Sequence, residues 1–313
     1  MSDPAGSSAF RDVGRALSNW GRWGADDQLG TLNHITPERT AAAARLARTG
    51  RLFDLGICAM KNGIQRKDGV RRNPLHLMQL TPLDMRDDPE HVCISDDYIT
   101  MPLQSVTQWD GLGHVGYDDR LYNDVPASSI TTLGGSPRLS IHRIAEKGVV
   151  GRGVLLDIAG LHGVERLEAG FRILPEALER AEAQQGVRVG PGDILLVRTG
   201  WIRHFTVDND VEPFWRGEPG IGLECAAWLH GREVAAIASD NWGVEVSPPD
   251  RSGGLPCHSV LIRDMGMTLG EIFDLDALAA DCRQDGVWEG FFTAPPLKVL
   301  NGVGSPITPL LIK

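Results

Sequence analysis

The stretch Pro191-Gly192-Asp193-Ile194-Leu195-Leu196-Val197-Arg198-Thr199 decides the fold class. Pro-Gly-Asp is typical of a turn, and the apolar run that follows it predicts a buried strand over 194–199. Two similar apolar runs, at 153–158 and 234–239, predict two more buried strands. The sequence between these strands predicts one helix over 175–185 and another over 223–231. Strands that alternate with helices are typical of the α/β class with a largely buried sheet.

The N-terminal part of the chain extends this alternation. Thr36-Pro37-Glu38 is typical of a helix start, and Gly50 is typical of the end of such a helix. Residues 52–57 then predict a short strand. The 313 residues contain no internal repeat and no Gly/Ser-rich linker. The sequence therefore predicts a mobile leader over 1–11 and a single domain over 12–313.

The composition is that of a globular protein, with 42% hydrophobic and 23% charged residues. Its formal net charge of −10 repels nucleic acid and anionic membrane surfaces, so we expect neither as a partner. The sequence holds no run of about 18 apolar residues, which is the length that a membrane span needs. The first residues also lack the pattern of a secretory signal. We therefore expect a cytoplasmic protein that acts on a small molecule.

Several common catalytic motifs are absent from the sequence. It has no G-x-S-x-G, no G-x-x-x-x-G-K-[ST], no H-E-x-x-H, and no G-x-G-x-x-G that opens a helix after a strand. Its five cysteines are widely spaced and form no CxxC pair, which disfavours both a disulfide framework and a structural zinc site. Serine hydrolases with a nucleophile elbow, phosphate-binding loops, dinucleotide folds and zincins are therefore disfavoured.

Two polar segments carry the side chains from which a catalytic or metal-binding site could be built. The first is Gln104-Ser105-Val106-Thr107-Gln108-Trp109-Asp110-Gly111-Leu112-Gly113-His114, which holds two amides, one carboxylate and one imidazole. The second runs from Pro256 to Glu271 and places His258 and Glu271 thirteen residues apart. Two imidazoles and two carboxylates suffice for a metal-activated water or for metal-free acid–base catalysis.

At these residues the chain resembles the cyclase-like amidohydrolases, the family that includes bacterial kynurenine formamidases and isatin hydrolases. The resemblance begins near residues 19–24 and 30–33, continues through 196–201 and ends with the block 258–271. It implies a compact α/β fold of the swivelling β/β/α type with a mixed sheet. It also implies assembly as a homodimer or a homotetramer.

The family signature has the form H-x-x-x-H-x-D-x-x-x-H, in which metal ligands precede a catalytic histidine. The resemblance places the two ligand histidines on Gln104 and Gln108, the ligand aspartate on Asp110 and the catalytic histidine on His114. Two imidazoles are therefore replaced by two carboxamides. The pattern Gln-x-x-[ST]-Gln-Trp-Asp-Gly is similar to that of a variant branch of the same family.

A later histidine and glutamate complete the family site, and they fall on His258 and Glu271. The remaining metal ligands implied by the resemblance are thus Asp110, His258 and Glu271. An amide oxygen is a hard, weak donor that suits Mg²⁺ or Mn²⁺ better than Zn²⁺. The sequence leaves two alternatives open: a divalent metal (Mn²⁺, Mg²⁺ or Zn²⁺) or no cofactor.

Three functions follow from these residues. The first is an arylformamidase-like hydrolase, which opens a C–N or C–O acyl bond of a small cyclic or aromatic formamide, lactam or lactone. In it, His114 and Asp110 are the catalytic residues. The second is a metal-independent cyclase or dehydratase of secondary metabolism, in which Asp110 and His114 form an acid–base pair. The third is a non-catalytic relative that binds a ligand.

The predicted substrate-binding residues are two amides and two indoles. Gln104 and Gln108 would position the substrate or donate to a developing oxyanion. We include Trp23, because the resemblance implies that an N-terminal tryptophan lines the pocket, and Trp109, although such residues more often belong to the core. We interpret Asp240-Asn241-Trp242, which follows the predicted strand 234–239, as an ordinary turn.

Overall fold

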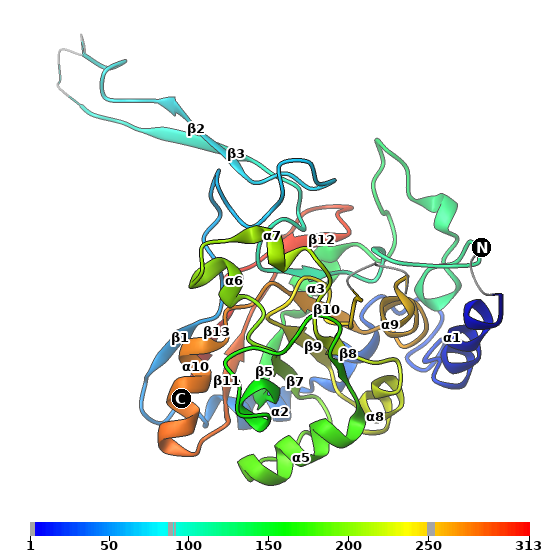
Figure 1. The fold of residues 1–313 in the computed structure, drawn as a ribbon. Helices are drawn as coiled ribbons and strands as arrows, with labels where there is room; N and C mark the ends of the chain where they lie inside the picture. Colours follow the sequence, from blue (N-terminus) through cyan, green and yellow to red (C-terminus); the bar gives the residue numbers. More distant parts are fainter. Residues whose placement is uncertain (1–3, 87–89, 91, 249–253) are drawn as a thin grey trace.

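A computed structural model describes residues 4–86, 90, 92–248 and 254–313, and its centre is a nine-stranded mixed sheet (Figure 1). The strand order is β1-β13-β11-β5-β7-β9-β10-β4-β12. The strands are β1 Leu52–Asp54, β4 Gln108–Asp110, β5 Val150–Asp157, β7 Ile194–Arg198, β9 Ala236–Ser239, β10 Thr268–Glu271, β11 Glu289–Thr293, β12 Gly304–Pro306 and β13 Leu310–Ile312. The four central strands β5, β7, β9 and β10 are parallel, and antiparallel strands flank them on both sides.

Helical crossovers explain the parallel centre, because parallel neighbours need a long connection. Helix α5 Pro175–Gln185 lies between β5 and β7 in the chain, and helix α8 Cys225–Gly231 lies between β7 and β9. Side chains of β7 alternate between two hydrophobic clusters, one on each face of the sheet. A sheet covered on both faces needs nearly continuous apolar strands, which is the pattern seen in the sequence. The predicted α/β class with a buried mixed sheet is confirmed.

The two faces are covered by different helices. Helices α5 and α8 and the π-helix η4 Ser259–Asp264 contribute to one cluster, while α3 and α10 contribute to the other. The remaining elements are α1 Pro4–Ala16, α2 Pro37–Ala44, α3 Ile141–Lys147, α4 Ile158–Leu161, α6 Arg203–Thr206, α7 Val211–Phe214, α9 Pro256–His258, α10 Asp276–Asp285, the 3-10 helices η1 Gly30–His34, η2 Tyr122–Asp124 and η3 Ala127–Ser129, and the strand pair β6 Arg172–Ile173 and β8 Gly220–Ile221. Within the described part of the chain, no helix combines the length and the apolar composition that a bilayer crossing needs.

The helix boundaries agree with the sequence in part. Helix α5 has the predicted bounds, and Gly186 ends it in the left-handed region at φ 66°. Thr36 caps α2 as expected, but that helix ends at Ala44 rather than near Gly50. Helix α1 occupies part of the predicted leader, and Val13 packs against a core cluster. Residues 1–3 lie outside the described chain, and the mobility of the leader and the single domain over 12–313 stay predictions.

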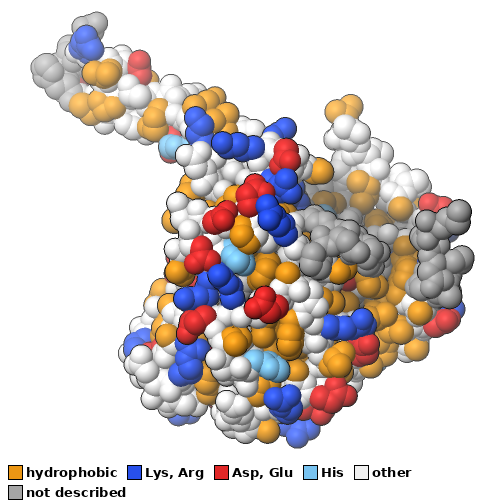
Figure 2. All heavy atoms as spheres, viewed as in Figure 1, with side chains coloured by type: hydrophobic (Ala, Val, Ile, Leu, Met, Phe, Trp, Pro, Cys, Tyr) orange, Lys and Arg blue, Asp and Glu red, His pale blue; other side chains and the backbone are white. Residues whose placement is uncertain are grey.

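A two-stranded arm stands away from the body of the molecule (Figure 1). It consists of β2 Leu75–Leu80, β3 Asp96–Thr100 and the chain between them, and its strands pair with each other and with no other described strand. Hydrophobic side chains lie along it, and Lys and Arg side chains gather where it joins the body (Figure 2). The sequence analysis made no prediction for this segment.

Gly270 in β10 is required by the packing of the sheet. A Cβ at this position would lie 2.5 Å from the Cβ of Ala238 and 2.6 Å from the ring of Trp109. We expect Gly270→Ala to destabilise the protein by about 3 kcal/mol through overpacking, as a lowered midpoint of denaturant unfolding. Gly231→Ala is the matched control, because Gly231 ends helix α8 and a Cβ there would have no neighbour within 4 Å. Equal midpoints for the two variants would contradict this account.

Candidate active site

Two neighbouring antiparallel strands bring the predicted site residues together. In the register of β4 and β10, Gln108 lies opposite Glu271 and Asp110 lies opposite Leu269. Alternate residues of a strand point to the same face, so Gln108, Asp110 and Glu271 share one face of the sheet. The amide nitrogen of Gln108 donates to Oε2 of Glu271. Residues 163 positions apart in the chain therefore form one cluster.

His258 reaches the same cluster from a helix above the sheet. It is the last residue of α9, which continues directly into the π-helix η4, a conformation that is often found at functional sites. Its Nε2 lies 3.2 Å from Oε1 of Glu271 and 4.0 Å from Oδ2 of Asp110. One donor atom from each of Asp110, His258 and Glu271 lies within 4.8 Å of the others. These three residues are the ligands that the resemblance implied.

Glu245 fixes the orientation of His258. Its Oε1 lies 2.5 Å from Nδ1 of His258 and also accepts a hydrogen bond from the backbone N–H of that residue at 3.0 Å. Its Oε2 accepts from the backbone N–H of Cys257 at 3.0 Å. A carboxylate on one ring nitrogen fixes the tautomer, and the other nitrogen is then directed to the cluster.

The cluster is buried, and burial dominates its electrostatics. Asp110 is completely buried, and burial together with the nearby Glu271 raises its pKa well above the usual range. Burial alone would lower the pKa of His258, but its hydrogen bonds to Glu245 and Glu271 outweigh that effect and raise it well above its ordinary value. Burial also raises the pKa of Glu218, which accepts from the backbone N–H of Trp242 at 2.6 Å. Several carboxyl groups thus share a small volume with one imidazole.

His114 lies at the edge of the cluster. Its Nε2 is 3.7 Å from Oδ2 of Asp110, and about a fifth of its side chain is exposed. Burial lowers the pKa of His114 to about 4, so the imidazole is neutral near pH 7. A neutral imidazole can accept a proton, which is the property that a general base needs.

The residues present fit a divalent cation. Both carboxylate oxygens of Asp110 and the amide oxygen of Gln108 are buried and have no hydrogen-bond partner among the described residues. Buried polar atoms are nearly always satisfied, so three unpartnered oxygens in one place call for a positive charge or a donor. Gly243 lies against the same cluster, because a Cβ there would be 3.1 Å from Oε1 of Glu218, 3.5 Å from Cε1 of His258 and 4.0 Å from Oε1 of Glu271.

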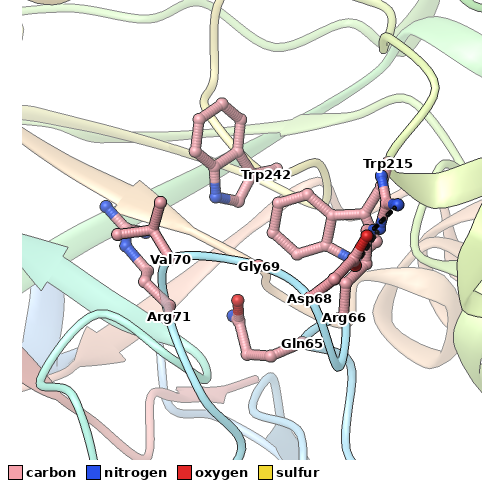
Figure 3. Close-up of a pocket in the computed structure, with 8 residues that line it drawn as sticks. All are labelled: Gln65, Arg66, Asp68, Gly69, Val70, Arg71, Trp215 and Trp242. Atoms are coloured by element: carbon pink, nitrogen blue, oxygen red, sulfur yellow. Dashed lines mark hydrogen bonds and ion pairs between the residues drawn. The ribbon is translucent and has the colours of Figure 1, made fainter.

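A pocket borders this cluster and is walled by two tryptophans and a cationic loop (Figure 3). Its volume is about 310 Å³, which is the lower end of the range for small-molecule sites. The rings of Trp215 and Trp242 lie 5.5 Å apart at 56°. Arg71, on the opposite wall, lies 5.7 Å from the ring of Trp242 and 3.6 Å from Oε2 of Glu271. Arg71 therefore connects the pocket to the buried cluster.

Three predicted substrate-binding residues, Trp23, Gln108 and Trp109, do not line this pocket. Trp109 is fully buried on the opposite face of the sheet, where its indole N–H donates to the backbone oxygen of Ala294. Trp23 packs edge-on against His34, and none of its described contacts involves the cluster. Gln108 donates to Glu271 instead of facing the pocket. The structure thus places Gln108 in the cluster and neither tryptophan in the wall of this pocket.

Gln104 lies beside the cluster. Its side chain is next to Gly304, which pairs with Asp110 across β4 and β12. Its backbone oxygen accepts a hydrogen bond from Arg71 at 3.0 Å. Gln104 thus lies between the strand that carries Asp110 and Arg71 of the pocket wall.

Five residues of the site were missed by the sequence analysis: Arg71, Trp215, Glu218, Trp242 and Glu245. A signal existed for Trp242 alone, because it follows β9, and the carboxyl ends of parallel strands are where α/β sites open. The interpretation of Asp240-Asn241-Trp242 as an ordinary turn was preferred over that signal. Asp240 does have a structural role, since its carboxylate accepts from the backbone N–H groups of Thr199 and Gly200.

Comparisons with known proteins identify the family of the chain. A model of the Cyclase family matches residues 32–246. The crystal structure of a novel cyclase is 40% identical, with a TM-score of 0.88, over 96% of this chain and 99% of the other. The fold and the buried site thus define a cyclase-fold protein. This chain belongs to the Cyclase family.

More distant solved structures share the fold. Isatin hydrolase A from Ralstonia solanacearum is 21% identical, with a TM-score of 0.61, over 88% of this chain and 97% of the other. A protein from Bacillus stearothermophilus described as a predicted metal-dependent hydrolase is 16% identical, with a TM-score of 0.52, over 83% of this chain and 97% of the other. Among curated proteins, no sequence matches the chain.

Proposed function

We propose that this chain is a hydrolase that opens a C–N or C–O acyl bond in a small cyclic or aromatic formamide, lactam or lactone. The observation that carries the proposal is the set of unpartnered oxygens on Asp110, which lies beside His258 and Glu271 and next to the tryptophan-walled pocket. An isatin hydrolase and a protein described as a predicted metal-dependent hydrolase, both with the same fold, support a hydrolytic reaction. An arylformamidase-like activity is the specific form that we propose.

Asp110, His258 and Glu271 would hold a divalent cation, with the oxygen of Gln108 as a further donor. Oxygen donors predominate in this set, which favours Mn²⁺ or Mg²⁺ over Zn²⁺. The cation, when bound, supplies Lewis-acid polarisation of the carbonyl and lowers the pKa of a water molecule. The N–H of Gln108 holds Glu271 in place, and Glu245 keeps Nε2 of His258 directed at the cluster.

His114 would move the proton. In hydrolysis the water oxygen forms a bond to the carbonyl carbon, the bond from that carbon to nitrogen or oxygen breaks, and the leaving atom gains a proton. His114 lies 3.7 Å from Asp110 at the edge of the cluster, where its neutral ring accepts the proton from water and delivers it to the leaving atom. Trp215 and Trp242 offer flat apolar surfaces for a ring, and Gln104 contacts the polar part of the substrate.

The test is turnover of a panel of formamides, lactams and lactones by the full chain, before and after chelation. We expect hydrolysis by the purified protein, its loss on chelation and its recovery with Mn²⁺ or Mg²⁺, with about one metal per chain by elemental analysis. Full hydrolysis after chelation would show that the reaction needs no metal and would leave His114 and Asp110 as its acid–base pair. Binding without turnover across the panel would support the non-catalytic relative.

We also propose that the enzyme works as a homodimer or a homotetramer, as the family resemblance implies. The cytoplasmic location stays a prediction from the sequence.

A further inference from the structure

Arg71 carries a positive charge into the wall of the pocket and is held there by one end of its guanidinium. Its Nη1 donates to the backbone oxygen of Gln104 at 3.0 Å, and its Nε and Nη2 make no hydrogen bond with the described residues. A guanidinium has five N–H donors, and the edge formed by Nε and Nη2 matches the two oxygens of a carboxylate. Arg71 is thus fixed in place and keeps a two-donor edge for a ligand.

The nearest described carboxylate does not occupy this edge. Oε2 of Glu271 lies 3.6 Å from Nη1 of Arg71, which is longer than a hydrogen bond. The oxygens of Glu271 have other partners, since Oε2 accepts from the amide of Gln108 and Oε1 lies 3.2 Å from Nε2 of His258. Glu271 therefore attracts Arg71 toward the cluster without satisfying its donors.

The second arginine of the pocket differs from Arg71, because it is already paired. Nε and Nη2 of Arg66 donate to the two carboxylate oxygens of Asp68 at 3.0 Å and 2.9 Å. This pair is neutral as a unit, and both of its members line the pocket. Arg71 therefore gives the pocket wall a net positive charge.

The surrounding loop strengthens this positive field. Residues 61–72 contain five Lys or Arg and one Asp, although the whole chain has a formal net charge of −10. Lys and Arg side chains gather on this part of the surface (Figure 2). A local basic surface next to a pocket raises the concentration of anions at its entrance. The loop thus favours a ligand with a negative charge.

The rest of the pocket suits a single aromatic ring. Figure 3 shows Arg71 on one side of the pocket and Trp215 on the other. The volume of about 310 Å³ is roughly twice that of a cavity of about 150 Å³ that takes benzene. One ring with its substituents therefore fills the space between the indoles and Arg71.

We infer that the substrate is a monocyclic aromatic acid and that Arg71 binds its carboxylate. This inference deepens the proposed function, since it names the substrate class of the same site. A phosphate dianion fits less well, because it calls for a second cation and Arg66 is occupied by Asp68. Arg71 borders both the pocket and Glu271, so the carboxylate and the acyl group that reacts lie on neighbouring positions of the ring.

Binding of two unreactive probes tests this inference in the full-length chain. Benzoate carries the charge, and nitrobenzene has the same shape without it. Calorimetric titration should give a Kd for benzoate about 10- to 100-fold below that for nitrobenzene, which is the range for a hydrogen-bonded charged group. Arg71→Gln should abolish this preference and leave the Kd of nitrobenzene unchanged. Arg71→Lys, which keeps the charge and loses the two-donor edge, should restore part of it.

Arg72→Gln is the matched control. Arg72 is the next residue of the same loop, is exposed and does not line the pocket, so its loss should leave the preference for benzoate intact. Nitrobenzene binding by each variant confirms that the pocket is folded. Equal Kd values for the two probes in the wild type, or a preference that survives in Arg71→Gln, would overturn the inference. Benzoate binding that chelation removes and Arg71→Gln does not change would place the carboxylate on a metal and overturn it as well.

Turnover separates this inference from the proposed function. The probes are 2-formamidobenzoate and formanilide, which differ only in the carboxylate next to the formamide. We expect a higher kcat/KM for the acid, and Arg71→Gln should raise its KM about 10- to 100-fold with little change in kcat, because the lost contact is made before and during the reaction. Equal hydrolysis of both probes would uphold the hydrolase and reject the carboxylate site. An Arg71-dependent preference for benzoate without any turnover would reject the hydrolase and uphold the carboxylate site.

Discussion

Replacing Asp110 with asparagine should lower turnover by on the order of 10³-fold, which corresponds to about 4 kcal/mol of transition-state stabilisation. The substitution removes a charged ligand from the cluster with His258 and Glu271 and nearly preserves the size of the side chain. The metal-free protein should keep its fold, because neither carboxylate oxygen of Asp110 makes a hydrogen bond in the structure. Added Mn²⁺ should raise the unfolding midpoint of the wild type and not of the variant, since a ligand stabilises only the state that it binds.

The control for this variant is Asp26→Asn. Asp26 is fully exposed, so its replacement removes the same charge from the surface and should change neither turnover nor the response to Mn²⁺. The measurements are kcat/KM with the substrate found in the panel and the unfolding midpoint with and without metal. An Asp110→Asn variant with full activity and a full response to Mn²⁺ would remove Asp110 from the site.

Replacing Glu245 with glutamine should weaken metal binding or activity by about 10- to 100-fold, the range seen when the partner of a ligand histidine is lost. Glu245 accepts hydrogen bonds from the ring of His258 and from two backbone N–H groups. An amide presents one donor where the carboxylate has only acceptors, so at least one of these contacts becomes unfavourable. The ring of His258 then loses its fixed tautomer.

Glu245 acts through His258, so its role has to be tested by a measurement that does not change when the variant is merely less stable. The ¹⁵N shifts of the His258 ring report its tautomer, and they should change in Glu245→Gln while the other histidines keep theirs. Glu224→Gln is the matched control, because Glu224 pairs with Arg172 at the surface, 2.8 Å away. Unchanged His258 shifts in Glu245→Gln would show that Glu245 does not orient the ring.

The central part of the fold was predictable because it repeats one simple pattern. The buried strands β5, β7 and β9 are short runs rich in apolar residues, and of the helices between them α5 starts at a proline and α8 ends at a glycine. Strands β10 to β13 were not predicted. They are three to five residues long, and β10 and β11 each include a glycine that packs against a neighbouring strand. These segments form strands because they pack against neighbouring strands, and this packing cannot be predicted from the local sequence pattern.

The site was predictable only through the family resemblance, since nothing in the spacing of Asp110, His258 and Glu271 places them together. The orientation of Trp109 was missed for a clear reason. In the strand Gln108–Asp110, Trp109 points to the opposite face from Gln108 and Asp110, but the glycines that follow Asp110 in the sequence are more typical of a loop than of a strand. Glu245 could not be found from the sequence, because its contact with His258 depends on how the segment after β9 meets helix α9 in space.

The candidate metal ligands Asp110 and Glu271 lie on strands of the sheet, whereas much of the pocket wall lies on loops. Asp110 and Glu271 are held by hydrogen-bonded strands of a sheet packed on both faces, whereas the wall over 65–71 and the indole of Trp215 belong to surface connections. Mutations in those connections can therefore alter which molecules are accepted while the reactive centre is inherited intact. Related chains can therefore differ in the substrates that they accept and still keep the same residues at the reactive centre.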